Sequence, residues 1–156
     1  GMLPGLSSVV APSLPGMNSF ELMAADVAAT GVTPGLMPVE MVRAALSAQG
    51  VVPAAELLHG VEDGTRVRVA GVITHRQHPA TAGGVTFLGM EDETGLINVV
   101  ISVGLWNKQR VLARTAKALV VRGIVQNASG AVSVVADRLE PLAMGELLSR
   151  GSRDFR

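Results

Sequence analysis

Residues 84–102 read GVTFLGMEDETGLINVVIS, and this stretch decides the fold. Two apolar runs of strand-like composition flank the acidic turn EDETG at 91–95, and both runs alternate with a period of two. Gly95 supplies the positive φ that a tight turn often needs, while Asp92 or Thr94 offers a side chain that hydrogen-bonds the local backbone. The pattern therefore predicts a β-hairpin.

The chain on either side of the hairpin predicts a barrel. Residues 65–77 alternate like a strand over their first half, and Gly71 allows that strand to bend between two sides of a barrel. Residues 103–116 have the spacing of a helix of roughly three turns, and 119–126 and 131–142 read as two further strands separated by a turn at 127–130. Three strands, a helix and two strands predict a mainly β fold, the five-stranded OB-fold barrel.

The first 63 residues differ in character. Residues 1–18 carry three prolines and read as a linker, and two short helices follow at 20–31 and 38–50, with a turn of helix near 53–58. The second helix is predicted to bury Met41, Ala44, Ala45 and Ala48. Because this segment is thin for an independent core, we expect it to pack on the barrel or on a neighbour outside this sequence. We divide the chain into 1–63, an OB-fold domain over 64–142, and a helical turn with a polar tail over 143–156.

The composition is that of a globular protein. Of 156 residues, 48% are hydrophobic and 17% charged, which excludes the low-hydrophobicity profile of disorder. No apolar run is long enough to cross a bilayer and no signal peptide is recognisable, so we expect a cytoplasmic protein with no membrane partner. The absence of cysteine excludes disulfides and thiolate zinc sites. Gly1-Met2 reads as a cloning remnant ahead of a fragment of a longer chain.

The net charge of zero hides an asymmetry between the two parts of the chain. Residues 1–63 hold six acidic residues and one basic residue, a net charge of −5. Residues 64–156 hold twelve basic and seven acidic residues, a net charge of +5. A basic second half hints at contact with nucleic acid, and a solvated surface that happens to be basic is an equal alternative.

No catalytic constellation is recognisable. His59, His75 and His78 do not lie at a metal-ligand helix spacing, and no phosphate loop or nucleophile motif is present. The acidic residues at 91–93 are better explained by the backbone of a turn than as Mg²⁺ ligands. We therefore expect no enzyme activity, no metal and no cofactor in this chain.

A binding groove is the better interpretation. OB barrels present a groove across their second and third strands, where single-stranded nucleic acid stacks bases on exposed rings and threads its phosphates past basic side chains. The candidate nucleic-acid-binding residues are Thr74, His75, Arg76, Gln77, His78, Phe87, Asn98, Arg110, Arg114 and Arg122.

Two of these assignments compete with a structural role. Phe87 is either a base-stacking platform or a residue of the barrel core, and the sequence favours the core. Trp106 followed by Arg110 and Arg114 at four-residue steps makes one helical face, for which a core anchor with a solvated arginine flank is favoured. With three phenylalanines, one tryptophan and no tyrosine, any DNA binding should be weak and electrostatic.

The strings THRQHPATAGGVTF at 74–87 and MEDETG at 90–95, together with SRDFR at the end, resemble the C-terminal portion of bacterial error-prone DNA polymerases. These are C-family paralogues of the DNA polymerase III alpha subunit. The resemblance implies a fragment of a DNA-directed DNA polymerase whose catalytic aspartates lie upstream, with an OB domain near the single-stranded template. It also implies partners: the remainder of the polymerase, the mutasome accessory proteins including an inactive Y-family-like polymerase, and indirectly the sliding clamp.

Three functional hypotheses follow. The first is an OB module that binds single-stranded DNA in a translesion polymerase. The second is a docking module for the mutasome partner or the rest of the polymerase, in which Leu22, Met23, Met37 and Met41 would form an interface. The third, an RNA-binding barrel of the tRNA-synthetase type, fits the surrounding strings less well.

Overall fold

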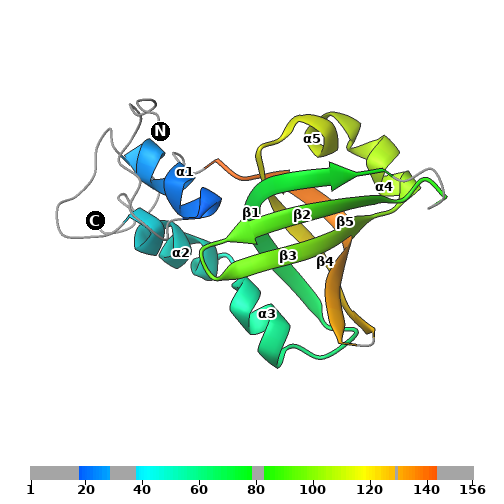
Figure 1. Cartoon of the computed structure of the whole chain (residues 1–156), viewed down its shortest axis with the longest axis horizontal. Helices are drawn as coiled ribbons and strands as arrows, with labels where there is room; N and C mark the ends of the chain where they lie inside the picture. The colour runs from blue at the N-terminus through cyan, green and yellow to red at the C-terminus, as the bar shows by residue number, and fades with distance from the viewer. Residues whose placement is uncertain (1–17, 29–37, 79–82, 129, 144–156) are drawn as a thin grey trace, which may run out of the picture.

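Five strands form a closed barrel in the order β1-β2-β3-β5-β4 (Figure 1). The computed structural model describes residues 18–28, 38–78, 83–128 and 130–143. β3 and β5 run parallel, and every other neighbouring pair is antiparallel. The strands are β1 (Arg66–Gln77), β2 (Thr86–Asp92), β3 (Gly95–Ile101), β4 (Ala118–Ala128) and β5 (Ala131–Pro141). With helices between β3 and β4, this mixed barrel is the predicted OB-fold.

β1 serves two sides of the barrel. Val72 pairs with Glu91 of β2 and also with Ala118 of β4, directly after Gly71. A Cβ atom at position 71 would lie 2.6 Å from the carbonyl oxygen of Glu91, so glycine is needed where the two strands approach most closely. β1 therefore bends where the sequence places its glycine.

The hairpin turn is held by its own side chains. Oδ1 of Asp92 accepts hydrogen bonds from the backbone N–H of Thr94 at 2.7 Å and of Gly95 at 3.1 Å, and Gly95 has a φ of +156°. The predicted positive φ of Gly95 and the predicted hydrogen bonds from the Asp92 side chain to the local backbone are thus confirmed. Oδ2 of Asp92 accepts the backbone N–H of Ala54 at 2.8 Å, which docks the start of α3 (Ala54–Gly60) on the turn.

Arg43 of α2 (Pro38–Ala48) closes the same turn from the other side. Its guanidinium lies 2.7 Å from Glu93 and 3.2 Å from the fully buried carboxylate of Asp92. Burial lowers the pKa of Arg43, but the hydrogen bonds and attraction from Glu93 and Asp92 outweigh that effect and hold the pKa above the usual arginine value. α2 is therefore tied to the barrel by a charged clamp.

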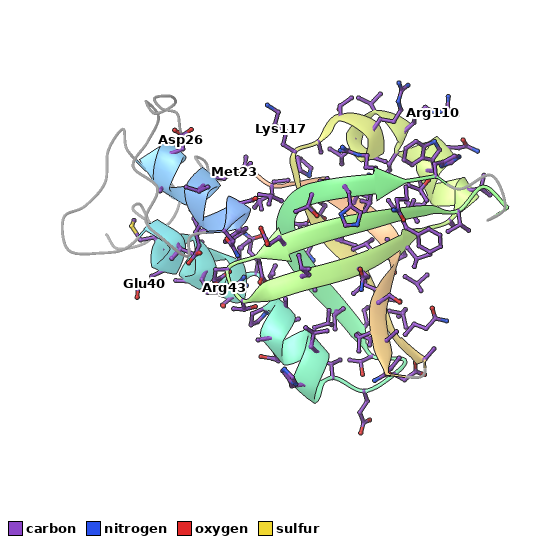
Figure 2. The ribbon with its side chains drawn as sticks, viewed as in Figure 1. Met23, Asp26, Glu40, Arg43, Arg110 and Lys117 are labelled. Carbon is purple, nitrogen blue, oxygen red and sulfur yellow. The ribbon has the colours of Figure 1, made fainter. Side chains whose placement is uncertain are left out.

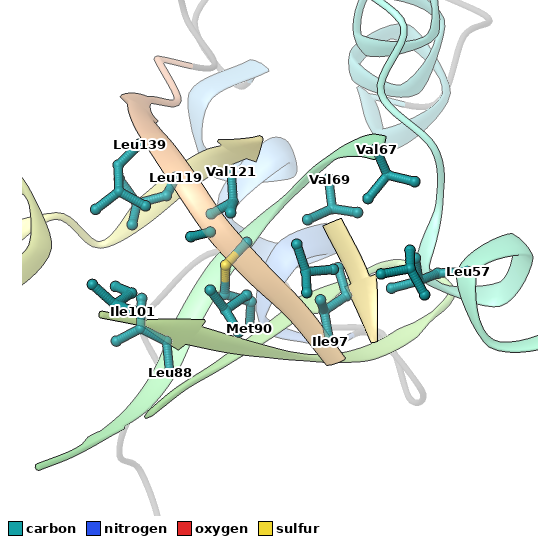
Figure 3. Close-up of a cluster of buried hydrophobic side chains, with 14 of the residues drawn as sticks. Leu57, Val67, Val69, Leu88, Met90, Ile97, Ile101, Leu119, Val121 and Leu139 are labelled. Carbon is teal, nitrogen blue, oxygen red and sulfur yellow. The ribbon is translucent and has the colours of Figure 1, made fainter. Parts of the chain in front are cut away.

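The barrel interior is filled by the inward side chains of alternating strand positions (Figure 3). In β3 the buried residues Ile97, Val99 and Ile101 alternate with less buried ones, as the period of two predicts. Leu57 of α3 packs on the same cluster at one end of the barrel. This core includes Leu57, Val69, Leu88, Met90, Ile97, Val99, Ile101, Leu105, Leu119, Val121 and Leu139.

A second apolar cluster joins the N-terminal helices to the outside of the barrel. Phe20 and Ala24 of α1 (Ser19–Ala28) pack with Val42 and Leu46 of α2. They cover outward-facing residues of β1 and β4, namely Ala70, Val72, Ala118 and Val120. The described part of the N-terminal segment thus packs on the barrel.

The buried face of α2 differs from the prediction. Val42 and Leu46 are fully buried, whereas Ala44 and Ala48 are exposed. Burying the larger side chains of Val42 and Leu46 against the barrel removes more apolar surface from water than burying alanines would. The correct apolar stripe is therefore rotated relative to the predicted one.

The predicted single helix between β3 and β4 is two short ones, α4 (Val103–Lys108) and α5 (Arg110–Thr115). The break lies at Gln109, whose side-chain amide pairs with the backbone of Leu139 in β5: Nε2 donates to the carbonyl and Oε1 accepts the N–H, both at 2.8 Å. The two helices therefore meet at a residue whose side chain contacts another strand, while its backbone keeps its hydrogen bonds to Leu105 and Ala113.

Two smaller outcomes concern the end of the barrel domain. The predicted turn at 127–130 is shorter, because Asn127 and Ala128 continue β4 and pair with β5. Residues 1–17 of the predicted linker over 1–18, and residues 144–156 of the predicted helical turn and tail over 143–156, lie outside the described residues. No helix within the described ranges is long and apolar enough to cross a membrane.

Candidate nucleic-acid interface

The outer face of β1, β2 and β3 carries two cross-strand rows of side chains. His75, Gly89 and Asn98 lie opposite one another in the first row. Gln77, Phe87 and Val100 form the second row, one step closer to the loop between β1 and β2. We call these six residues the strand face. It contains no carboxylate, so nothing in either row repels a phosphate backbone.

Gly89 is the residue of the strand face that has no side chain. The imidazole of His75 lies over it, and a Cβ atom at position 89 would overlap the ring. Thr74, at the bulge in β1, donates its hydroxyl to the carbonyl of Gly89 at 3.1 Å. The ring of His75 therefore covers the buried backbone of Gly89 and lies beside Asn98 on the sheet.

Phe87 is 39% exposed. The core interpretation that the sequence favoured is therefore wrong: Thr86 and Leu88 are the buried neighbours, and the alternation of β2 turns Phe87 outward. Leu96, on the same side of β3 as Asn98 and Val100, is 57% exposed. The strand face thus combines an exposed ring with polar and aliphatic side chains.

His78 closes one end of the strand face. Its Nδ1 lies 2.6 Å from the hydroxyl of the buried Thr86, and its ring is 5.5 Å from that of Trp106 in α4, at 40°. Trp106 is half-buried and packs against the barrel core. This end of the face is therefore joined to α4.

Arg76 points away from the strand face. Its Nε donates to the carbonyl of Ala113 at 2.8 Å, and its other guanidinium nitrogen donates to the carbonyl of Ala116. These are carbonyls at the end of α5, which lack partners within their own helix. Arg76 therefore fastens α5 to β1.

Arg122 also lies elsewhere, on the outer side of β4. It pairs with Asp137 at 2.7 Å, and Arg66 of β1 binds the same carboxylate at 2.7 Å. Slight burial works to raise the pKa of Asp137, but the hydrogen bonds from Arg122 and Arg66 outweigh it and hold the pKa below its usual value. Arg122 is thus held by a carboxylate that it shares with Arg66 on the outside of the barrel.

Arg110 and Arg114 are exposed on α5. Arg110 donates to the side-chain oxygen of Asn107 at 3.0 Å. Because the helix breaks at Gln109, these arginines do not continue one regular helical face with Trp106.

The structure therefore brings together His75, Gln77, Phe87 and Asn98, with Thr74 and His78 at the edges. Arg76 and Arg122 point away from them, and Arg110 and Arg114 lie on α5 rather than in the sheet. Sequence reasoning missed Gly89 and Val100, although the period of two already placed Gly89 with Phe87 and Val100 with Asn98.

Residues 67–142 match a family model described as an OB-fold nucleic acid binding domain. The error-prone DNA polymerase of Corynebacterium efficiens is 70% identical over 156 residues, which are 100% of this chain and 14% of that protein. The chain is homologous to one region of the error-prone DNA polymerases. Those of Corynebacterium glutamicum and Mycobacterium tuberculosis are 67% and 56% identical over 100% and 99% of the chain.

This error-prone polymerase homologue spans 14–15% of the length of these relatives. Among solved structures, asparaginyl-tRNA synthetase from Pyrococcus horikoshii aligns with 58% of the chain and 22% of its own, at 24% identity and a TM-score of 0.48. Within the described ranges, no group of three His, Asp or Glu side chains is placed to hold a metal ion.

Proposed function

We propose that this chain is the OB module of an error-prone DNA polymerase and that it binds single-stranded DNA along the strand face. The observation that carries the proposal is the exposed ring of Phe87, on the same face of the sheet as His75 and Asn98. A stacked base gains about 1–3 kcal/mol on an aromatic side chain.

The polar side chains of the strand face support the same reading. His75 and Asn98 flank Gly89, and Gln77 lies beside Phe87, so each base-sized position has hydrogen-bonding groups at its border. One exposed ring gives little stacking energy in total. Binding should therefore be weak, with little base preference and a strong dependence on salt.

The homology suggests the setting of this module. In the whole polymerase, nucleotidyl transfer would belong to other parts of the chain, and the strand bound here would be the template. The remainder of the polymerase, the mutasome accessory proteins and, indirectly, the sliding clamp are the proposed protein partners.

Fluorescence anisotropy of a labelled single-stranded oligonucleotide tests the proposal. We expect binding at low salt that weakens as salt rises. Phe87→Ala should weaken it about 5- to 150-fold, the loss of one base stack. Leu58→Ala is the matched control, because Leu58 is a similarly exposed apolar side chain (43%) on α3, outside the strand face.

Two results would overturn the DNA-binding proposal. One is the absence of binding by the folded wild-type chain at low salt. The other is an equal effect of the Phe87 and Leu58 substitutions, which would show that the ring is not a specific contact.

Docking of a protein partner is the second candidate function, and the exposed Leu96 favours it. Leu96 is 57% exposed and lies on the same side of β3 as Val100. An apolar side chain this exposed, on the same face of the sheet as Phe87, also suits a protein interface. If the chain binds no DNA but binds a purified mutasome component or polymerase fragment, and Phe87→Ala abolishes that, the second function holds.

A further inference from the structure

A long stretch of the chain contains no acidic residue. From residue 96 to residue 136 there are five basic residues and no Asp or Glu. Four of them fall on the α4–α5 segment and the link to β4, and all four are exposed. We call them the basic ridge: Lys108, Arg110, Arg114 and Lys117. Figure 2 shows Arg110 and Lys117 projecting from the same side of the molecule.

The basic ridge differs from the other cationic surfaces of the described chain. Arg66 and Arg122 share Asp137, and Arg68 and Arg138 share Glu140. Arg43 is held by two carboxylates of the hairpin turn. In contrast, no ridge side chain forms an ion pair with any residue that the structure describes. Its charge is therefore free to attract a phosphate.

The basic ridge borders the strand face. α4 is joined to the end of these strands by the contact between Trp106 and His78, and His78 is in turn bound to Thr86, whose side chain lies on the opposite side of β2 from Phe87. α5 is fastened along β1 by Arg76, whose side chain leaves that strand on the side opposite to His75 and Gln77. In Figure 1, α4 and α5 accordingly lie along the β1 side of the barrel.

We propose that the basic ridge binds the phosphates of the same DNA strand whose bases lie on the strand face. This inference rests on the proposed function and deepens it. A single strand that turns its bases toward Phe87 presents its phosphates along a border of the sheet, and each neutralised phosphate releases counterions. The ridge supplies unpaired cations at that border, while the strand face supplies stacking.

The salt dependence of binding measures phosphate contacts directly. For single strands, the slope of log K against log salt changes by about 0.7 for each phosphate neutralised. We expect Arg114→Gln and Lys117→Gln each to make the slope shallower by about that amount and to weaken binding at low salt. Both positions are exposed, and Arg114 lies in α5, where glutamine has good helix propensity, so the variants should fold, as circular dichroism would show.

Arg66→Gln is the matched control. It removes the same charge from an exposed side chain on the outer side of β1, where Asp137 retains its second partner, Arg122. We expect its slope to equal that of the wild type. An equal loss of slope in Arg66→Gln and the ridge variants would show a general effect of net charge and would refute the ridge.

A DNA strand of the same length without bases distinguishes the contribution of the strand face to binding from that of the basic ridge. Without bases, Phe87→Ala should have no effect, whereas Arg114→Gln and Lys117→Gln should still reduce the slope. If the wild type binds no DNA, the proposed function fails together with the ridge. If the wild type binds and depends on Phe87, but the ridge variants keep the wild-type slope, the ridge alone is refuted.

Discussion

Gly71 and Gly104 are the same residue in opposite surroundings. Gly71 lies where β1 bends, and a Cβ atom there would be 2.6 Å from a backbone oxygen of β2, which has no freedom to move away. Gly104 lies inside α4, where an added Cβ atom meets nothing within 4 Å. The first glycine is required by the barrel, while the second only weakens a helix.

We therefore predict opposite effects of one substitution. Gly71→Ala should lower the free energy of unfolding by about 1–3 kcal/mol, because the strands must separate to admit the methyl group. Gly104→Ala should raise it by about 0.5–1 kcal/mol by reducing the entropy of the unfolded chain. Urea denaturation of the two variants and the wild type measures both changes. Equal shifts of the two midpoints would contradict the steric account of Gly71.

The exposure of Phe87 also depends on a single residue position. The alternation of β2 was readable in the sequence, and it places Phe87 opposite to Leu88. Which of the two faces is the core was not readable, because both carry an apolar residue. Only the closure of the barrel buried Leu88 and left Phe87 outside.

Among the elements, α4 and α5 are short helices held by contacts with two strands of the barrel. Each has six residues, too few for a stable helix without tertiary contacts. Gln109 at their junction keeps its backbone hydrogen bonds to Leu105 and Ala113, and its side-chain amide adds a paired contact to the backbone of Leu139. Arg76 then binds the free carbonyls at the end of α5. The two helices are therefore held by β5 and β1 more than by each other.

We predict that Gln109→Ala lowers the free energy of unfolding by about 1–3 kcal/mol, because it leaves a donor and an acceptor of Leu139 without partners. Asn107→Ala is the control, since Asn107 is exposed and bonds only the side chain of Arg110. Its effect should stay within about 0.5 kcal/mol. Thermal or urea unfolding would decide, and equal effects of both substitutions would show that the contact to β5 has no special weight.

For the molecule as a whole, the hairpin turn is the point where the N-terminal helices join the barrel. Asp92 binds α3 through the N–H of Ala54 and α2 through Arg43, and Glu93 reinforces the latter contact. The apolar cluster around Phe20 completes the attachment on the outside of β1 and β4. The described helices thus reach the barrel without covering the strand face.

We predict that Arg43→Met lowers the free energy of unfolding by about 3–5 kcal/mol, because it leaves the fully buried Asp92 without its countercharge. Arg68→Met should cost no more than about 1 kcal/mol, since the pair of Arg68 and Glu140 is partly exposed to solvent. Urea denaturation compares the two. A cost for Arg43→Met as small as that for Arg68→Met would refute the clamp.

The amino-acid sequence was sufficient to predict the hairpin, the order of strands and helix along the chain, and hence the OB-fold. Each of these follows from short-range patterns: a period of two, a turn rich in Asp, Thr and Gly, and a glycine at a bend. It was also sufficient for the homology to error-prone polymerases, which the comparisons confirm. The roles of the candidate binding residues stay predictions.

The assignment of individual arginines depended on the folded structure. Arg76 binds a carbonyl 37 residues away, Arg122 a carboxylate 15 residues away, and Gln109 a strand 30 residues away. In the sequence the two arginines look like free cations and Gln109 looks like an ordinary helix residue, because their partners are brought near only when the barrel closes. Local periodicity determines which elements form, whereas long-range packing determines which side chains remain free to bind a ligand.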